Sequence, residues 1–242
     1  FTSFGFAFSG LVIAVVVADG GRGELDDVEV GVYHARPEGE RKGGVVLVQE
    51  IFGVTDHIRE LCDEYAAEGY EVLSPQLYDR EHPDFESGYA NADYERAVEL
   101  ARKLHPFEQS VSDAITCISW LKEQGDTVFA MGFCYGGSVS WRCGQLSDDL
   151  SAVSSYYGSL VPTEFIEPAP KCAAIAHFGR YDMGIPMEGV DALVAKEHPT
   201  AQIFVYEAGH GFNSDRRKDY HPESAELAKE RTLGLFEVLG GR

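Results

Sequence analysis

Residues 127–137 read Thr-Val-Phe-Ala-Met-Gly-Phe-Cys-Tyr-Gly-Gly, and this stretch decides how the chain is expected to fold. The apolar run 127–133 predicts a buried strand, and a helix is expected to follow the glycines. Between them, residues 132–137 match the strand–turn–helix pattern that presents a nucleophile, with Cys134 where serine is usual. Glycine at 132 and 136 has a steric reason, because a side chain at either position would collide with the neighbouring strand or helix.

Cys134 is interpreted as a nucleophile because of this setting. A helix that begins just after it places free N–H groups and partial positive charge near the sulfur. The alternative is a buried core cysteine, which is the usual environment of a free thiol. The five cysteines are odd in number and contain no CxxC pair, so neither a disulfide framework nor a zinc ribbon is expected. Reduced thiols fit a cytoplasmic protein.

Two further polar residues follow predicted strands in the order that this architecture uses for its acid and its histidine. Asp182 lies just after the predicted strand 172–178, and His210 lies just after the predicted strand 202–206. His210 would act as the base and Asp182 would hold its imidazole. The alternatives are a turn or helix-cap role for Asp182 and a loop histidine on a glycine-rich turn for His210. The three residue types in this order favour a catalytic set.

The rest of the chain alternates apolar runs with helical periodicity, which predicts an α/β fold with a mostly parallel sheet and helices on both faces. We expect one domain over residues 27–242, preceded by an apolar arm or extra strand over 1–26, and a long surface loop over 80–92. Strands are expected at 45–48, 70–73, 127–133, 152–156, 172–178 and 202–206, and helices at 58–66, 94–101, 111–118, after Cys134, and at 223–239.

The charge balance limits the classes of partner that the protein is expected to bind. Twenty Lys and Arg against forty Asp and Glu give a net charge of −20, which repels phosphate backbones and anionic lipid. We therefore expect no nucleic-acid partner and no membrane association, and any anionic ligand must be held by specific cations. The apolar run from Phe4 to Ala18 lacks a preceding basic residue and is shorter than the roughly 20 residues that span a bilayer. The other histidines show no metal-ligand spacing, so no metal and no cofactor is expected.

Taken together, these motifs resemble the dienelactone hydrolase family of α/β-hydrolases. The resemblance covers the chain from roughly residue 27 to the last predicted helix. It implies an α/β-hydrolase fold and hydrolysis of the cyclic enol ester of dienelactone to maleylacetate, a step in the breakdown of chlorinated aromatics; relatives act on other esters. The segments that carry it are 49–54 (Gln-Glu-Ile-Phe-Gly-Val), 75–80 (Pro-Gln-Leu-Tyr-Asp-Arg), the Cys134 turn, 156–158 (Tyr-Tyr-Gly), Asp182 and 208–210 (Ala-Gly-His).

The resemblance implies Cys134 as nucleophile, His210 as base and Asp182 as the residue that orients it. It also implies that the backbone N–H groups of Ile51 and Tyr135 form the oxyanion hole. Both N–H groups flank strand ends that are expected to face the same crevice. One such donor is typically worth about 3 kcal/mol to the transition state.

Glu50 is implied to lie close to the resting thiol. A carboxylate at the end of an apolar strand is costly to bury without a partner, so we expect a cation or a hydrogen-bond donor beside it. The alternative is an exposed loop glutamate. In the family, this glutamate is released by a rearrangement linked to substrate binding, which suggests that the ligand activates the nucleophile.

Arg80 matches a family position that binds the substrate carboxylate, and the planar guanidinium suits that purpose. The alternative is a surface arginine paired with Asp79 or Glu81. The family also has an arginine four residues after the catalytic histidine.

That second position is Ser214 in this chain. Arg216 and Arg217, slightly further along, are the candidates to replace the missing guanidinium. Tyr157, Ser214 and Arg216 are included with Arg80 as substrate-binding candidates, although buried strand aromatics such as Tyr157 more often belong to the core.

The expected function is hydrolysis of a small, anionic enol-lactone through an acyl-cysteine intermediate, by a monomer or dimer whose partner is a small-molecule ester or lactone. One alternative is a carboxylesterase or thioesterase of the same fold, which the serine at position 214 favours. The other is a non-catalytic, redox-responsive protein in which Cys134 senses oxidant.

Overall fold

The computed structural model describes residues 15–17, 28–125 and 127–240. Seven strands form one sheet in the order β3-β5-β4-β6-β7-β8-β9, and all neighbours are parallel except the antiparallel pair of β3 with β5. Its strands are β3 (Val32–Ala35), β4 (Gly43–Val48), β5 (Tyr70–Pro75), β6 (Val128–Phe133), β7 (Ala152–Tyr156), β8 (Ala173–Gly179) and β9 (Ala201–Tyr206).

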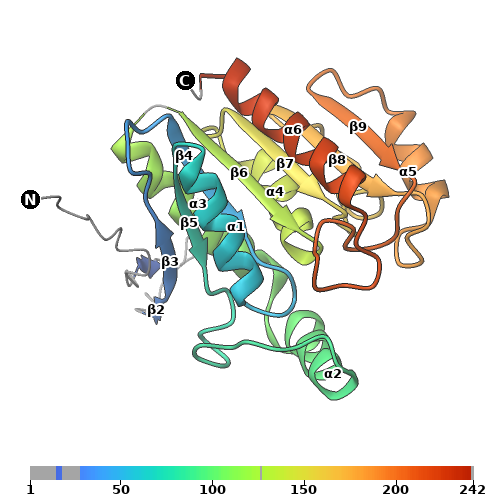
Figure 1. The fold of residues 1–242 in the computed structure, drawn as a ribbon, viewed down its shortest axis with the longest axis horizontal. Helices are drawn as coiled ribbons and strands as arrows, with labels where there is room; N and C mark the ends of the chain where they lie inside the picture. Colours follow the sequence, from blue (N-terminus) through green and yellow to red (C-terminus); the bar gives the residue numbers. More distant parts are fainter. Residues whose placement is uncertain (1–14, 18–27, 126, 241–242) are drawn as a thin grey trace, which may run out of the picture.

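Helices cover both faces of this sheet (Figure 1). One face carries α1 (Asp56–Ala67) and α6 (Pro222–Val238), and the other carries α3 (Phe107–Gln124) and α4 (Tyr135–Leu146). The remaining helices lie in connections: α2 (Asn91–Glu99), the π-helical turn η1 (Leu100–Leu104) and α5 (Met187–Val194). This arrangement confirms the predicted α/β class.

The central strands β4 and β6 determine where the polar residues gather. Every residue of both strands is buried, as expected for strands covered on two faces. The two strands pair in parallel, with Val48 opposite Gly132, so they end at the same edge of the sheet. The chain leaves that edge toward Glu50 after β4 and toward Cys134 after β6. In open α/β sheets, ligands bind at this carboxyl edge.

The predicted segments differ from the structure in several places. Neither the edge strand β3 nor helix α5 was predicted, and the helix expected over 94–101 is divided into α2 and η1. The expected arm over 1–26 falls mostly outside the described residues; within it, β1 (Val15–Val17) pairs antiparallel with β2 (Val28–Val30). Among the described residues, no helix combines the length and the apolar character that crossing a bilayer requires.

Candidate active site

Cys134 occupies a sharp turn between β6 and α4. Its φ of +54° is uncommon for a residue with a side chain and costs about 1–3 kcal/mol. The turn is close-packed on both sides: a Cβ atom on Gly132 would lie 2.2 Å from the carbonyl oxygen of Gly136, and one on Gly136 would lie 2.3 Å from that of Val48. The steric reason expected for both glycines is therefore confirmed.

Cys134, His210 and Asp182 meet although they are far apart in the sequence. The Nε2 atom of His210 lies 3.1 Å from the Sγ atom of Cys134, and its Nδ1 atom lies 2.6 Å from Oδ2 of Asp182. The Asp182 side chain is fully buried, while that of His210 keeps an exposed fraction of 22%. One ring nitrogen thus faces the sulfur and the other faces the carboxylate, which is the geometry of a nucleophile, a base and a residue that orients it.

The charge state of His210 follows from these neighbours. Burial lowers its pKa, but the charge of the Cys134 sulfur and the hydrogen bond to Asp182 act in the opposite direction and are together stronger, so the pKa is raised to about 10. At neutral pH this favours an imidazolium ion beside the sulfur. An adjacent cation of this kind stabilises a thiolate, the reactive form of cysteine.

The backbone groups expected to hold an oxyanion lie beside Cys134. Tyr135 is the first residue of α4, so its N–H has no carbonyl partner within that helix. Ile51 follows the end of β4, which pairs with β6. Both residues therefore follow strands that end at the same edge of the sheet.

Glu50 is buried and has a cation beside it. The Nη1 atom of Arg217 lies 3.3 Å from Oε1 of Glu50, whose side chain has an exposed fraction of only 2%. Gly211, with φ +75°, makes room for this arginine, because a Cβ atom there would lie 2.7 Å from the Arg217 Cδ atom. The expectation of a cation or a hydrogen-bond donor beside Glu50 is confirmed, and the alternative of an exposed glutamate is wrong.

Arg216 does not reach this carboxylate. Its guanidinium pairs with Glu60 and Asp215 on the surface. Of the two candidates, it is Arg217, seven residues after His210, that lies beside Glu50, while Arg216 pairs elsewhere. The conformation of the turn after His210 determines that the Arg217 side chain, rather than that of Arg216, points toward Glu50. Sequence spacing alone could not show this.

Arg80 is also engaged differently from the expectation. Its Nη1 and Nη2 atoms lie 2.6 and 3.0 Å from the two carboxylate oxygens of Asp113, which is buried on α3. The pair is bidentate, so the fork that was expected to receive a substrate carboxylate is occupied. The partner is neither Asp79 nor Glu81, so the alternative pairing is corrected as well.

Three buried hydroxyl groups surround the Glu50–Arg217 pair. The hydroxyl of Tyr157 and Oε2 of Glu50 have no hydrogen-bond partner among the described residues, while the hydroxyls of Tyr89 and Ser214 face each other. Burial and the Glu50 charge raise the pKa of both tyrosines. Tyr157, at φ +40°, also packs its ring 5.2 Å from that of His210.

Tyr89 was not identified from the sequence. It lies in the loop expected over 80–92, and no motif marks it. In the structure its ring packs against Phe52, and the Arg217 guanidinium lies 5.8 Å from the ring centroid. Only the tertiary contact could have identified this residue.

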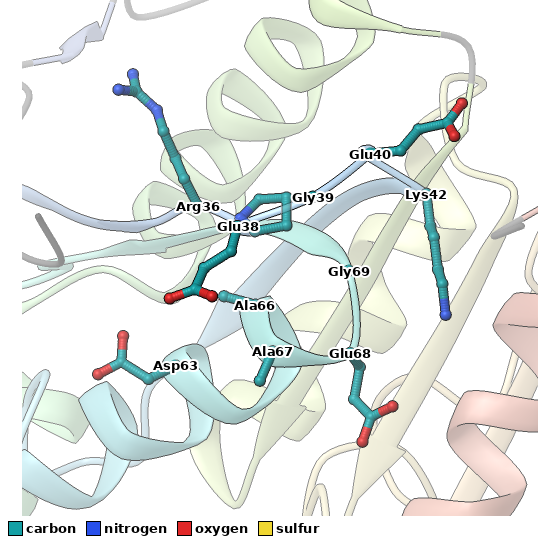
Figure 2. Close-up of a pocket in the computed structure, with 11 residues that line it drawn as sticks. Arg36, Glu38, Gly39, Glu40, Lys42, Asp63, Ala66, Ala67, Glu68 and Gly69 are labelled. Atoms are coloured by element: carbon teal, nitrogen blue, oxygen red, sulfur yellow. The ribbon is translucent and has the colours of Figure 1, made fainter. Parts of the chain in front are cut away.

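A separate surface hollow lies at the opposite end of the strands. It has a volume of about 550 Å³ and is lined by the β3–β4 connection and the end of α1, including Arg36, Lys42, Asp63 and Glu68 (Figure 2). Both acidic and basic side chains line it, and it does not include Cys134. Within the described part of the chain, no three His, Cys, Asp or Glu side chains converge as metal ligands.

Comparison with known proteins identifies the family of the chain. The model of the dienelactone hydrolase family matches residues 30–239. A protein of Escherichia coli (strain K12), provisionally named a carboxymethylenebutenolidase, is 34% identical over 231 residues, which cover 87% of this chain and 83% of that protein. A protein of Synechocystis sp. with the same provisional name is 31% identical and covers 88% of this chain and 93% of its own length.

A solved structure is similar over almost the whole fold. The crystal structure of a protein from Klebsiella pneumoniae subsp. pneumoniae, provisionally named a dienelactone hydrolase, has a TM-score of 0.76 and 30% sequence identity. The match covers 94% of this chain and 99% of the Klebsiella chain.

Proposed function

The chain belongs to the dienelactone hydrolase family and is a hydrolase of the ester or lactone type, and from this premise we propose that it opens a small anionic enol-lactone with Cys134 as nucleophile. The observation that carries the proposal is the continuous contact of Cys134 with His210 at 3.1 Å and of His210 with Asp182 at 2.6 Å. A thiol, a base and a carboxylate in this order can perform acyl transfer.

In the proposed first half-reaction, the Cys134 thiolate attacks the lactone carbonyl carbon and a C–S bond forms. The carbonyl oxygen becomes an oxyanion that accepts hydrogen bonds from the N–H groups of Ile51 and Tyr135. When the ring C–O bond breaks, the imidazolium of His210 donates its proton to the leaving enolate. Asp182 holds the imidazole so that Nε2 keeps facing the reacting atoms.

In the second half-reaction, neutral His210 accepts a proton from water while the water oxygen attacks the thioester carbonyl. The C–S bond then breaks, the acid product leaves and the thiolate is regenerated beside the imidazolium. Enolates are good leaving groups, so this pair suffices for an enol ester. Unactivated esters and amides should react poorly.

The anionic substrate is supported by the surroundings of Glu50. Arg217 offers a guanidinium near the buried hydroxyls of Tyr89, Tyr157 and Ser214, and these are donors suited to a carboxylate. A substrate carboxylate that pairs with Arg217 would compete with Glu50 for the same cation. Substrate binding and release of Glu50 would then be one event.

A trapping experiment tests the covalent step. In the variant His210→Ala, the thioester formed from an activated ester lacks the base that activates water, so an acyl adduct on Cys134 should accumulate and appear by intact-protein mass spectrometry and peptide mapping. The variant Cys134→Ala should show neither adduct nor turnover. Full turnover by Cys134→Ala would contradict the proposal, and failure of the unmodified protein to turn over any activated ester would favour the redox-responsive alternative.

A second candidate is an esterase or thioesterase with less preference for anions. The observation that favours it is the bidentate pairing of Arg80 with Asp113, which leaves fewer cations for a substrate carboxylate. Comparing kcat/KM for dienelactone with that for a neutral ester of similar size separates the two candidates.

A further inference from the structure

A chain of four side chains leads from the loop after β5 to the residue that follows the nucleophile. The Nδ1 atom of His105 lies 2.8 Å from Oε2 of Glu81, and its Nε2 atom lies 2.9 Å from Oγ of Ser110. Ser110 Oγ lies 2.9 Å from the hydroxyl of Tyr135. The hydroxyl of Tyr135 is thus the end of a continuous hydrogen-bonded series that is separate from the contacts among Cys134, His210 and Asp182.

The series is buried and can be satisfied at every position. The side chain of His105 is fully buried and that of Glu81 has an exposed fraction of 23%. When Nδ1–H of His105 donates to the Glu81 carboxylate, Nε2 of the neutral ring accepts from the Ser110 hydroxyl. Ser110 in turn accepts from the hydroxyl of Tyr135. All donors then point toward Glu81, and a buried network in which every member is paired holds its side chains rigidly.

The surroundings of Tyr135 fix its ring as well. Its centroid lies 5.5 Å from that of Phe107 at a near-perpendicular angle and 6.1 Å from that of Tyr78. The Arg80–Asp113 pair joins the same loop to the same helix, α3, that carries Ser110. The Arg80–Asp113 ion pair and the His105–Glu81 hydrogen bond therefore both hold the surroundings of Tyr135 in place.

We propose that Tyr135 is a positioning residue, and that its anchored hydroxyl holds its own backbone N–H in the direction of the substrate's developing oxyanion. This inference rests on the proposed function. The N–H belongs to the peptide unit after Cys134, whose φ of +54° is strained, so the turn would relax if nothing resisted it. Oxyanion donors act only when they lie within about 2.7–3.1 Å of the oxyanion position, so a small rotation of this peptide weakens them.

The variant Tyr135→Phe removes the hydroxyl and keeps the ring. We expect kcat for an activated ester to fall by about 3- to 30-fold, a fraction of the 10²–10³ that loss of a whole oxyanion donor costs. KM should be unchanged, because the oxyanion exists only in the transition state. Rates are normalised to reactive Cys134 by burst titration, so that unfolded protein does not contribute. Ser110→Ala should reproduce the effect, and the double variant should be no slower than either single variant.

Tyr156→Phe is the matched control. Tyr156 is also buried, and its hydroxyl lies 2.8 Å from Thr232 of α6, on the other face of the sheet. This variant should lose stability without a loss of normalised kcat. Equal kcat in Tyr135→Phe and the unmodified protein, or equal losses in Tyr135→Phe and Tyr156→Phe, would overturn the inference. Absence of Cys134-dependent turnover in the unmodified protein would instead overturn the proposed function.

Discussion

At the scale of single residues, Asp182 makes both of the contacts that the sequence presents as alternatives. Its Oδ2 atom contacts His210, while Oδ1 accepts a hydrogen bond from the N–H of Gly184 at 2.8 Å. The second bond closes a turn and fixes the carboxylate that faces the imidazole. The turn interpretation and the catalytic interpretation therefore describe the same side chain.

The two arginines considered for substrate recognition should behave differently. Arg217→Gln should raise KM for an anionic lactone by about 10-fold or more, since a charge-assisted hydrogen bond is worth about 1.5–3 kcal/mol. The kcat/KM for a neutral ester of similar size should change much less. Steady-state kinetics with both substrates measure this difference.

Arg80→Gln is the control for that experiment. Removing this guanidinium leaves Asp113 buried without its cation, so the free energy of unfolding should fall by about 3–5 kcal/mol. Urea denaturation measures this loss. A selective loss of anionic substrate in Arg80→Gln, with unchanged stability, would restore Arg80 as the recognition residue.

At the scale of helices and strands, segments with continuous burial were predictable and marginal segments were not. The strands β4 and β6 are uninterrupted apolar runs because helices cover both faces. In contrast, β3 has four residues at the edge of the sheet, where it needs no long apolar run. Helix α5 buries only Val190 and Leu193 over eight residues, too few for a helical period to be recognised.

The turn around Cys134 should tolerate no added methyl group. In Gly136→Ala the new Cβ atom would lie 2.3 Å from a backbone oxygen of β4, which cannot move without breaking the sheet. We expect the free energy of unfolding to fall by at least about 3 kcal/mol, at the upper end of the usual range for overpacking. Thermal and urea denaturation measure it.

Gly234 in helix α6 provides the matched substitution. Nothing lies within 4 Å of a Cβ atom placed there, so Gly234→Ala should stabilise the protein by about 0.5–1 kcal/mol through helix propensity. A comparable loss of stability in both variants would show that alanine is harmful for a reason other than crowding at the turn.

At the scale of the whole molecule, two histidines set opposite pH limits on stability. Burial and the Arg231 charge lower the pKa of His177 to about 3, while the pKa of His210 is raised to about 10. Between pH 6.5 and about 3, His177 is protonated in the unfolded chain but stays neutral in the folded protein, so stability falls as the pH falls. Above about pH 8.5 the unfolded chain has released the protons of both this imidazole and the Cys134 thiol, whereas folded His210 keeps its proton up to about pH 10, so stability falls as the pH rises.

Chemical denaturation between pH 4 and 9.5 checks both limits. His177→Gln should flatten the acid side of the stability curve, and His210→Gln should flatten the alkaline side. The slopes are compared rather than the absolute values, because either substitution can also change packing. An unchanged alkaline slope in His210→Gln would contradict the proton on this imidazole.

Most of the site was predictable because its central members follow strands. Cys134, Asp182, His210 and Glu50 each come after a predicted strand, and the parallel sheet brings those ends to one edge. The side chains of Arg217 and Tyr89 reach the site from loops, so their position depends on how the loop turns rather than on where a strand ends. The role of Arg80 in binding a substrate carboxylate was predicted from its position in the family pattern. That position does not show that the Asp113 carboxylate on α3 pairs with the same guanidinium.

The Glu50–Arg217 pair shows that a charged group can keep its place in a fold although its position in the sequence changes. The family that the chain resembles has an arginine four residues after the histidine, and here the guanidinium belongs to Arg217, three residues further along the chain. The turn between His210 and Arg217 has room for this side chain because residue 211 is glycine. Column-by-column comparison of sequences would score this cation as lost. Searches for related enzymes should therefore compare the position of this guanidinium in three dimensions and allow the length of the loop that carries it to vary.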